Sequence, residues 1–140
     1  MHKHYGDFLG GRAAIGLLLL RVVAGLAMMI HGKDKILNPF GWMDRPGKPS
    51  PMPDIVQALA ALGEFGGGLG LLVGLLTPIA AFGIAVVMLG AIFTVHAGDP
   101  WIGKGRSFEN AANYLLIAAV VMLTGPGIYS LDAKLFGKRR

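Results

Sequence analysis

The sequence predicts an all-α integral membrane protein, an antiparallel bundle of four helices in a single domain. Hydrophobic residues make up 54% of the 140 residues and charged residues only 15%, whereas soluble chains carry roughly 25% charged residues. Four apolar stretches also approach the roughly 20 residues that a helix needs to cross a bilayer. None of them shows the period-two alternation of barrel strands. Because backbone polar groups in a bilayer must be satisfied within a span, we predict that these stretches are helices.

The first predicted helix covers residues 13–35 and is followed by a proline-rich loop, residues 38–53. The helix is apolar except for Arg21 until it reaches His31 and Lys35, which lie one turn apart near its end. The loop is longer than most connections, and long loops of this kind are often functional. Its aromatic residues are interpreted as an interfacial belt or, alternatively, as a lid over a polar site.

The second predicted helix covers residues 55–76 and carries one intramembrane acid, Glu64. It is rich in glycine, the residue that allows the closest approach of helices in a membrane. We therefore interpret the glycines as packing positions. The alternative is that the run of residues 66–68 leaves room for a flat ligand beside Glu64. The glycines form three overlapping pairs of G-x-x-x-G spacing, Gly63/Gly67, Gly66/Gly70 and Gly70/Gly74.

The third and fourth predicted helices cover residues 78–97 and 108–124. Pro78 suits a first helical turn. Turn-forming residues end both helices, Gly98-Asp99-Pro100 after the third and Gly125-Pro126-Gly127 after the fourth.

An even number of spans places both termini on one side of the membrane. We expect the chain in the cell (inner) membrane as a multi-pass protein. Lys and Arg are equally numerous on the two sides, so the positive-inside rule leaves the orientation open. The basic cluster Lys138-Arg139-Arg140 favours cytoplasmic termini.

Charges inside a membrane usually face inward and find partners, because each costs about 2.5–3.5 kcal/mol near a helix centre. Counting about 1.5 Å per residue from each predicted helix start places Arg21 and Glu64 at similar depths. The sequence therefore predicts that Arg21 and Glu64 meet or share a water, either as a structural ion pair or as the polar floor of a ligand pocket.

A second cluster of polar side chains is predicted on the side of the long loops, where the first and third helices end and the fourth begins. Asn110 is adjacent to this cluster. Histidines and carboxylates together can move protons near neutral pH, as a quinol requires when it is oxidised. The predicted catalytic residues are His31, Glu64, His96 and Glu109. The predicted quinone-binding residues are Arg21, Lys35, Gly67, Asn113 and Trp101.

Metal and haem sites are the alternatives for this group. His31, His96 and Glu109 have the composition of a two-histidine, one-carboxylate site, and two histidines can ligate a haem. No H-x-x-x-H or E-x-x-H pair supports either, so we predict no metal and no haem. The chain has no cysteine, which excludes disulfides, cysteine-ligated iron–sulfur clusters and thiol catalysis.

Several motifs resemble the DoxX family of membrane proteins, and together they cover nearly the whole chain. The resemblance implies four membrane helices, and DoxX/DoxD members are associated with a thiosulfate:quinone oxidoreductase and with redox-stress complexes. The resemblance implies that the residues with functional roles in the family correspond here to Arg21, Glu64, Glu109 and His31. The fold is also similar to that of vitamin K epoxide reductase-like proteins, whose thiol chemistry cannot apply without cysteine. The motifs are residues 18–25 with His31-Gly32-x-x-Lys35, then Gly63-Glu64-Phe65-Gly66-Gly67 with Gly74-Leu75-Leu76-Thr77-Pro78, and finally Phe108-Glu109-Asn110 with Gly125-Pro126-Gly127-Ile128-Tyr129-Ser130-Leu131-Asp132.

The predicted function is that of a quinone-interacting oxidoreductase subunit with a polar pocket inside the bundle. A non-catalytic anchor or assembly subunit of a redox complex and a small proton-coupled transporter are the alternatives. The expected partners are the lipid bilayer and a soluble or membrane redox subunit, with self-association left open. The net charge of +5 suggests anionic lipid headgroups. Nucleic acid is not expected, because no basic cluster is interleaved with aromatic residues.

Overall fold

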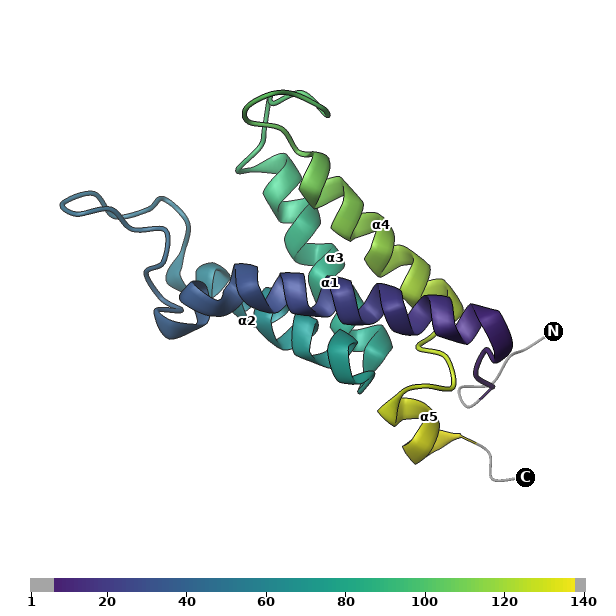
Figure 1. Ribbon diagram of the computed structural model, residues 1–140. Helices are drawn as coiled ribbons and strands as arrows, with labels where there is room; N and C mark the ends of the chain where they lie inside the picture. The colour runs from purple at the N-terminus through teal and green to yellow at the C-terminus, as the bar shows by residue number, and fades with distance from the viewer. Residues whose placement is uncertain (1–6, 138–140) are drawn as a thin grey trace.

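A computed structural model of the chain describes residues 7–137 and consists of helices and loops (Figure 1). The all-α prediction is confirmed, and a short fifth helix was not predicted. The helices are α1 (Gly11–Leu37), α2 (Asp54–Val73), α3 (Thr77–Phe93), α4 (Glu109–Thr124) and α5 (Leu131–Phe136).

The four main helices pack as two antiparallel hairpins. α1 packs against α2 and α3 against α4, and the two hairpins meet along the seam between α2 and α3. Contacts between α1 and α4 are sparse. Figure 1 shows the α1–α2 pair lying across the α3–α4 pair. The bundle is therefore less parallel than the four-helix prediction implied.

Glycines set the closest helix contacts, as the packing interpretation predicted. A Cβ atom on Gly25 would lie 2.7 Å from the carbonyl oxygen of Gly68, and one on Gly68 would lie 2.8 Å from that of Gly25. The backbones of α1 and α2 therefore touch. On the α3 side, a Cβ on Gly67 would lie 2.8 Å from Ile84 Cγ1, and one on Gly70 would lie 2.6 Å from Ala80 Cβ.

Large apolar side chains point outward along the main helices, which suits a lipid environment. α1 and α2 are long and apolar enough to cross a membrane, and α3 and α4 are shorter apolar helices of 17 and 16 residues. Side chains of this outward surface include Leu19, Val23, Ile30, Leu62, Phe82 and Leu116.

The beginning of α1 and the short α5 lie at one end of the molecule, as an even number of spans predicts (Figure 1). Loops 38–53 and 94–108 lie away from that end, and we call this side the loop end. α2 ends at Val73 because Gly74 adopts a left-handed conformation with φ 69°. α3 ends at Phe93, earlier than predicted, so His96 lies in the turn after the helix. The cytoplasmic location of the termini stays a prediction.

Candidate functional site

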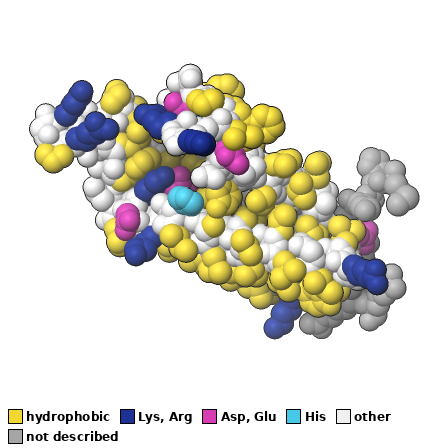
Figure 2. Space-filling view, turned by 45° about the horizontal axis from the view of Figure 1, so that its top comes forward, with side chains coloured by type: hydrophobic (Ala, Val, Ile, Leu, Met, Phe, Trp, Pro, Cys, Tyr) yellow, Lys and Arg dark blue, Asp and Glu magenta, His cyan; other side chains and the backbone are white. Residues whose placement is uncertain are grey.

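A groove of about 1210 Å³ runs between the two hairpins and continues along the seam of α2 and α3. This volume is somewhat larger than the roughly 300–1,000 Å³ of most small-molecule sites. Most of its walls are apolar, and its ionisable side chains lie toward the loop end. Figure 2 shows the hollow between the two lobes, with a histidine and charged side chains gathered at it.

An ion pair between α1 and α2 forms the polar end of the groove. The Nζ atom of Lys35 lies 2.7 Å from both carboxylate oxygens of Glu64. The Glu64 side chain is only 7% exposed and that of Lys35 25%. Gly32 makes the pair possible, since a Cβ there would lie 2.7 Å from the backbone nitrogen of Phe65. The close helix approach brings Lys35 to Glu64, and pairing offsets the cost of burying both charges.

The proline-rich loop folds back over this ion pair. The Trp42 ring centroid lies 4.4 Å from Lys35 Nζ, in cation–π contact. The loop is held by Gln57, an almost fully buried amide on α2. Trp42 Nε1 donates to the Gln57 backbone oxygen at 2.8 Å, Met43 N donates to its Oε1 at 2.9 Å, and its Nε2 donates to the Met52 oxygen at 3.1 Å. Trp42 is therefore the aromatic residue that covers the polar end.

His31 faces the groove beside a tyrosine of α4. The Nδ1 atom of His31 lies 2.9 Å from the carbonyl oxygen of Ala27. A carbonyl can only accept, so Nδ1 carries the hydrogen and Nε2 is free to accept a proton. The His31 ring meets the Tyr114 ring edge-on at 5.9 Å between centroids. Met28, Asn110 and Tyr114 also line the groove.

Gln57 and Tyr114 were not among the predicted site residues. Gln57 lies seven residues before Glu64, so both side chains project from the same face of α2. Tyr114 lies one turn after Asn110 on α4 and shares its face. This spacing was the signal that could have identified both residues.

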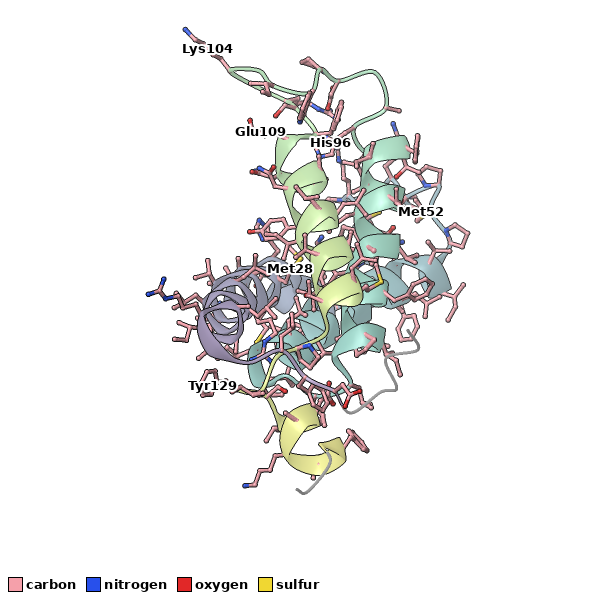
Figure 3. The ribbon with its side chains drawn as sticks, turned by 90° about the vertical axis from the view of Figure 1, so that its right-hand side faces the viewer. Met28, Met52, His96, Lys104, Glu109 and Tyr129 are labelled. Carbon is pink, nitrogen blue, oxygen red and sulfur yellow. The ribbon has the colours of Figure 1, made fainter. Side chains whose placement is uncertain are left out.

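Besides Arg21, His31 and Gly67, four predicted site residues lie outside the Lys35–Glu64 ion pair. His96 lines the groove together with His31, and its Nδ1 lies 2.9 Å from Asp99 Oδ2. Trp101 is 61% exposed. Glu109 is absent from the groove lining, and Asn113 lines a separate cavity of about 360 Å³ between α1 and α4. Figure 3 shows His96 and Glu109 at the loop end, with Met28 deeper in the molecule.

The His96–Asp99 pair belongs to an exposed cluster of the 94–108 loop. The hydrogen bond from His96 lowers the pKa of the Asp99 carboxyl. Burial opposes this shift, and the nearby charge of Arg106 adds to it. Arg106 Nε lies 3.3 Å from Asp99 Oδ2. Within residues 7–137, no three histidine, aspartate or glutamate side chains are grouped so as to hold a metal ion.

Gly67 also lines the groove, but its missing side chain serves helix packing. A Cβ at this position would lie 3.0 Å from the Ala80 backbone oxygen as well as against Ile84. At Gly68 the space that a side chain would occupy is likewise filled, in this case by α1. The idea that residues 66–68 together leave a flat slot beside Glu64 is therefore wrong for two of the three glycines.

The predicted meeting of Arg21 and Glu64 is wrong. The side chain of Arg21 is fully buried at the opposite end of α2, where its Nη2 donates to the Tyr129 carbonyl oxygen at 2.6 Å. α1 and α2 are offset along their axes, so Gly25 faces Gly68 and Arg21, one turn earlier, faces Gly74. The depths predicted for Arg21 and Glu64 were counted from the helix starts and took no account of this offset.

Asp132 joins the C-terminal segment to the turn between α2 and α3. Its carboxylate accepts hydrogen bonds from the backbone nitrogens of Leu76 and Thr77, both at 2.8 Å. Its own backbone nitrogen donates to the Gly74 oxygen at 2.8 Å. Asp132 also attracts the Arg21 guanidinium electrostatically. Arg21 is therefore part of a structural junction and not of the groove.

The fold and the groove define a class, that of multi-pass helical membrane proteins with an apolar groove that ends in a largely buried ion pair. The chain belongs to the DoxX family, whose model matches residues 16–97. The family prediction is therefore confirmed.

Three relatives are similar over most of their length. A Bacillus subtilis protein named "Putative oxidoreductase CatD" is 33% identical over 131 residues, 89% of this chain and 91% of the relative. An "Uncharacterized protein" of Haemophilus influenzae is 32% identical over 87% of this chain and 92% of its own length. The Escherichia coli "Inner membrane protein YqjF" is 31% identical over 84% and 90%, respectively. No solved structure matches the chain significantly.

These findings place the chain in the inner membrane as a multi-pass protein. The absence of cysteine leaves no disulfide and no cysteine-ligated iron–sulfur cluster.

Proposed function

We propose that this DoxX protein binds a quinone or quinol in the groove and serves as the membrane subunit of an oxidoreductase. The observation that carries the proposal is the Lys35–Glu64 ion pair, set at one end of a large apolar groove and covered by Trp42. Burying charged groups in a membrane is costly, so an ion pair of this kind is expected to have a functional or a structural role.

Lys35 and His31 supply the two interactions that a quinone couple needs. A quinone oxygen accepts a hydrogen bond, and the corresponding quinol hydroxyl donates one. The ammonium group of Lys35 has three N–H donors, and Glu64 offers two oxygens to them. The remaining donor belongs to the same Nζ atom that contacts the Trp42 ring, and it would serve a quinone oxygen that enters beside the indole. His31 Nε2 is an acceptor and can take a proton when a quinol is oxidised.

The electrons must come from or go to another redox protein. Reduction of a quinone takes two electrons and two protons, and cysteine is absent from the chain. The groups in the groove can hold the ring and exchange protons, and a partner redox subunit would supply or take the electrons. The name of the Bacillus subtilis relative supports the oxidoreductase class.

A second reading is a non-catalytic anchor or assembly subunit. It is favoured by the fact that both oxygens of Glu64 are bound to Lys35, which ties α1 to α2. In that reading the ion pair holds the hairpin together, and the groove is filled by ordinary lipid. The two readings differ in whether a quinone changes the environment of Trp42.

Tryptophan fluorescence tests the proposal directly. The chain has two tryptophans, so the Trp101→Phe variant reports only on Trp42. In lipid nanodiscs, a short-tailed benzoquinone is expected to quench Trp42 saturably. Glu64→Gln is expected to weaken binding by roughly tenfold or more, because it removes the carboxylate that holds the Lys35 ammonium in place, and a hydrogen bond from such a charged group contributes about 1.5–3 kcal/mol.

Glu109→Gln is the matched control, because Glu109 is an acid on α4 outside the groove lining. Its affinity for the quinone should equal that of the parent. A linear, non-saturable quench, or equal affinities in the Glu64 and Glu109 variants, would overturn the quinone site and leave the anchor reading.

A further inference from the structure

We infer that the groove is built for a quinone with a long isoprenoid tail, and that the tail lies along the α2–α3 seam across Gly66. This inference rests on the proposed quinone site and extends it to the class of ligand. Three features of the groove support it: its one-sided polarity, its length and the open surface at one glycine.

Polar groups are confined to one end of the groove. His31, Lys35, Glu64 and His96 are its ionisable lining residues, with Gln57, Asn110 and Tyr114 near them. On α2 beyond Glu64, and on α3 up to Gly90, the lining side chains are all apolar. A ligand that fills the groove must therefore have a polar head and a long apolar remainder.

The apolar part is long enough for a tail. It extends along α2 from Glu64 to Val73, nine residues or roughly 14 Å at the helical rise, and continues to Leu75 and Leu76 in the turn that follows. Leu62, Leu69 and Phe82 border it and are exposed. An aromatic ring alone would occupy the polar end and leave most of the 1210 Å³ empty.

Gly66 keeps this part of the groove open, and helix packing does not explain its lack of a side chain. A Cβ on Gly63, Gly67, Gly68 or Gly70 would lie within 2.9 Å of a neighbouring helix. At Gly66 the Cβ would meet only the Leu62 side chain of its own helix, 3.1 Å from Cδ1. Glycine inside a helix costs about 1 kcal/mol relative to alanine. Helix packing therefore does not account for the glycine at this position, whereas an open groove wall does.

The Gly66→Leu variant tests the inference, because it fills the groove without pushing helices apart. Gly16→Leu is the matched control: a Cβ there meets nothing within 4 Å, and Gly16 lies outside the groove lining. Binding is measured by Trp42 quenching in the Trp101→Phe background. A tail-less quinone and its long-tailed homologue are compared at equal mole fraction in the lipid.

In the parent and in Gly16→Leu, the long-tailed quinone is expected to bind at least tenfold more tightly than the tail-less one. Gly66→Leu should abolish that difference while leaving the affinity for the tail-less quinone within about twofold. A long-tailed quinone with a photoreactive group on its tail should label α2 and α3 between residues 66 and 86.

The result that would overturn the inference is equal affinity for both quinones in the parent, or an unchanged tail advantage in Gly66→Leu. Labelling of α1 or α4 alone would overturn it as well. These outcomes leave the quinone site intact, provided the tail-less quinone still binds in a Glu64-dependent manner. If the tail-less quinone does not bind at all, the proposed function itself fails.

Discussion

Replacing Asp132 with alanine is expected to destabilise the protein by about 3–6 kcal/mol. The carboxylate accepts two backbone hydrogen bonds at 2.8 Å, from Leu76 and Thr77. A hydrogen bond to a charged group contributes about 1.5–3 kcal/mol, and its loss leaves a buried donor unsatisfied. The substitution also removes the negative charge near the buried Arg21, whose Nε and Nη1 atoms have no partner within the described residues.

The asparagine variant should be intermediate between the parent and the alanine variant. Asp132→Asn keeps one acceptor oxygen and loses the charge, so we expect it to lose about half as much stability as the alanine variant. Leu76 adds a further check, because it is a non-glycine residue with a left-handed φ of 47°. Such a conformation costs roughly 1–2 kcal/mol. Leu76→Gly should therefore recover part of the stability lost in Asp132→Ala.

The assay is reversible unfolding in mixed micelles, followed by circular dichroism as the fraction of denaturing detergent rises. Asp34→Ala is the matched control, since Asp34 is an exposed aspartate at the end of α1. It should unfold with the parent. If Asp132→Ala also unfolds within 1 kcal/mol of the parent, the reasoning about this junction is refuted.

Two further predictions concern the α1–α2 contact and the 94–108 loop. Gly68→Leu should unfold at lower detergent fraction than the parent or fail to fold, because a Cβ there would lie 2.8 Å from backbone atoms of Gly25 and Met29; parent-like unfolding would contradict the contact. His96→Ala should raise the pKa of Asp99 toward its ordinary 3.8, since the hydrogen bond from His96 lowers it. The stabilisation from Asp99 is present above that ordinary pKa and is lost as the pH falls through the lowered one. Carbon NMR of the Asp99 carboxyl follows both, and an unchanged midpoint in His96→Ala would count against the pair.

The sequence predicts the helices well because their signals are local. Apolar runs define the spans, and glycine and proline mark their ends, as at Gly74 and Pro78. His31 and Lys35 could be placed together for the same reason, since one helical turn separates them. The groove location of Glu64 follows from its being the acid of an apolar helix.

Pairings between helices are less accessible to sequence reasoning. The partner of Glu64 depends on the offset between α1 and α2, and backbone contact between Gly25 and Gly68 sets that offset. Neither helix alone contains this information. The hydrogen bond from the Thr77 backbone nitrogen to the Asp132 carboxylate joins residues 55 positions apart in the chain. The motif around Asp132 gave no indication of this partner.

Loop 38–53 is attached to Gln57 at two points, and the segment between these points forms the tip of the loop. Met43 and Met52 are both bonded to the Gln57 side chain, so the segment between them can change in length or composition without displacing the indole that covers Lys35. An epitope or a fluorescent label inserted at Gly47, which has a φ of 71° and lies in the turn between the bridged residues Arg45 and Lys48, would report on the loop end from outside the membrane. The tip of loop 38–53 can therefore vary in sequence while Trp42 keeps its position over Lys35.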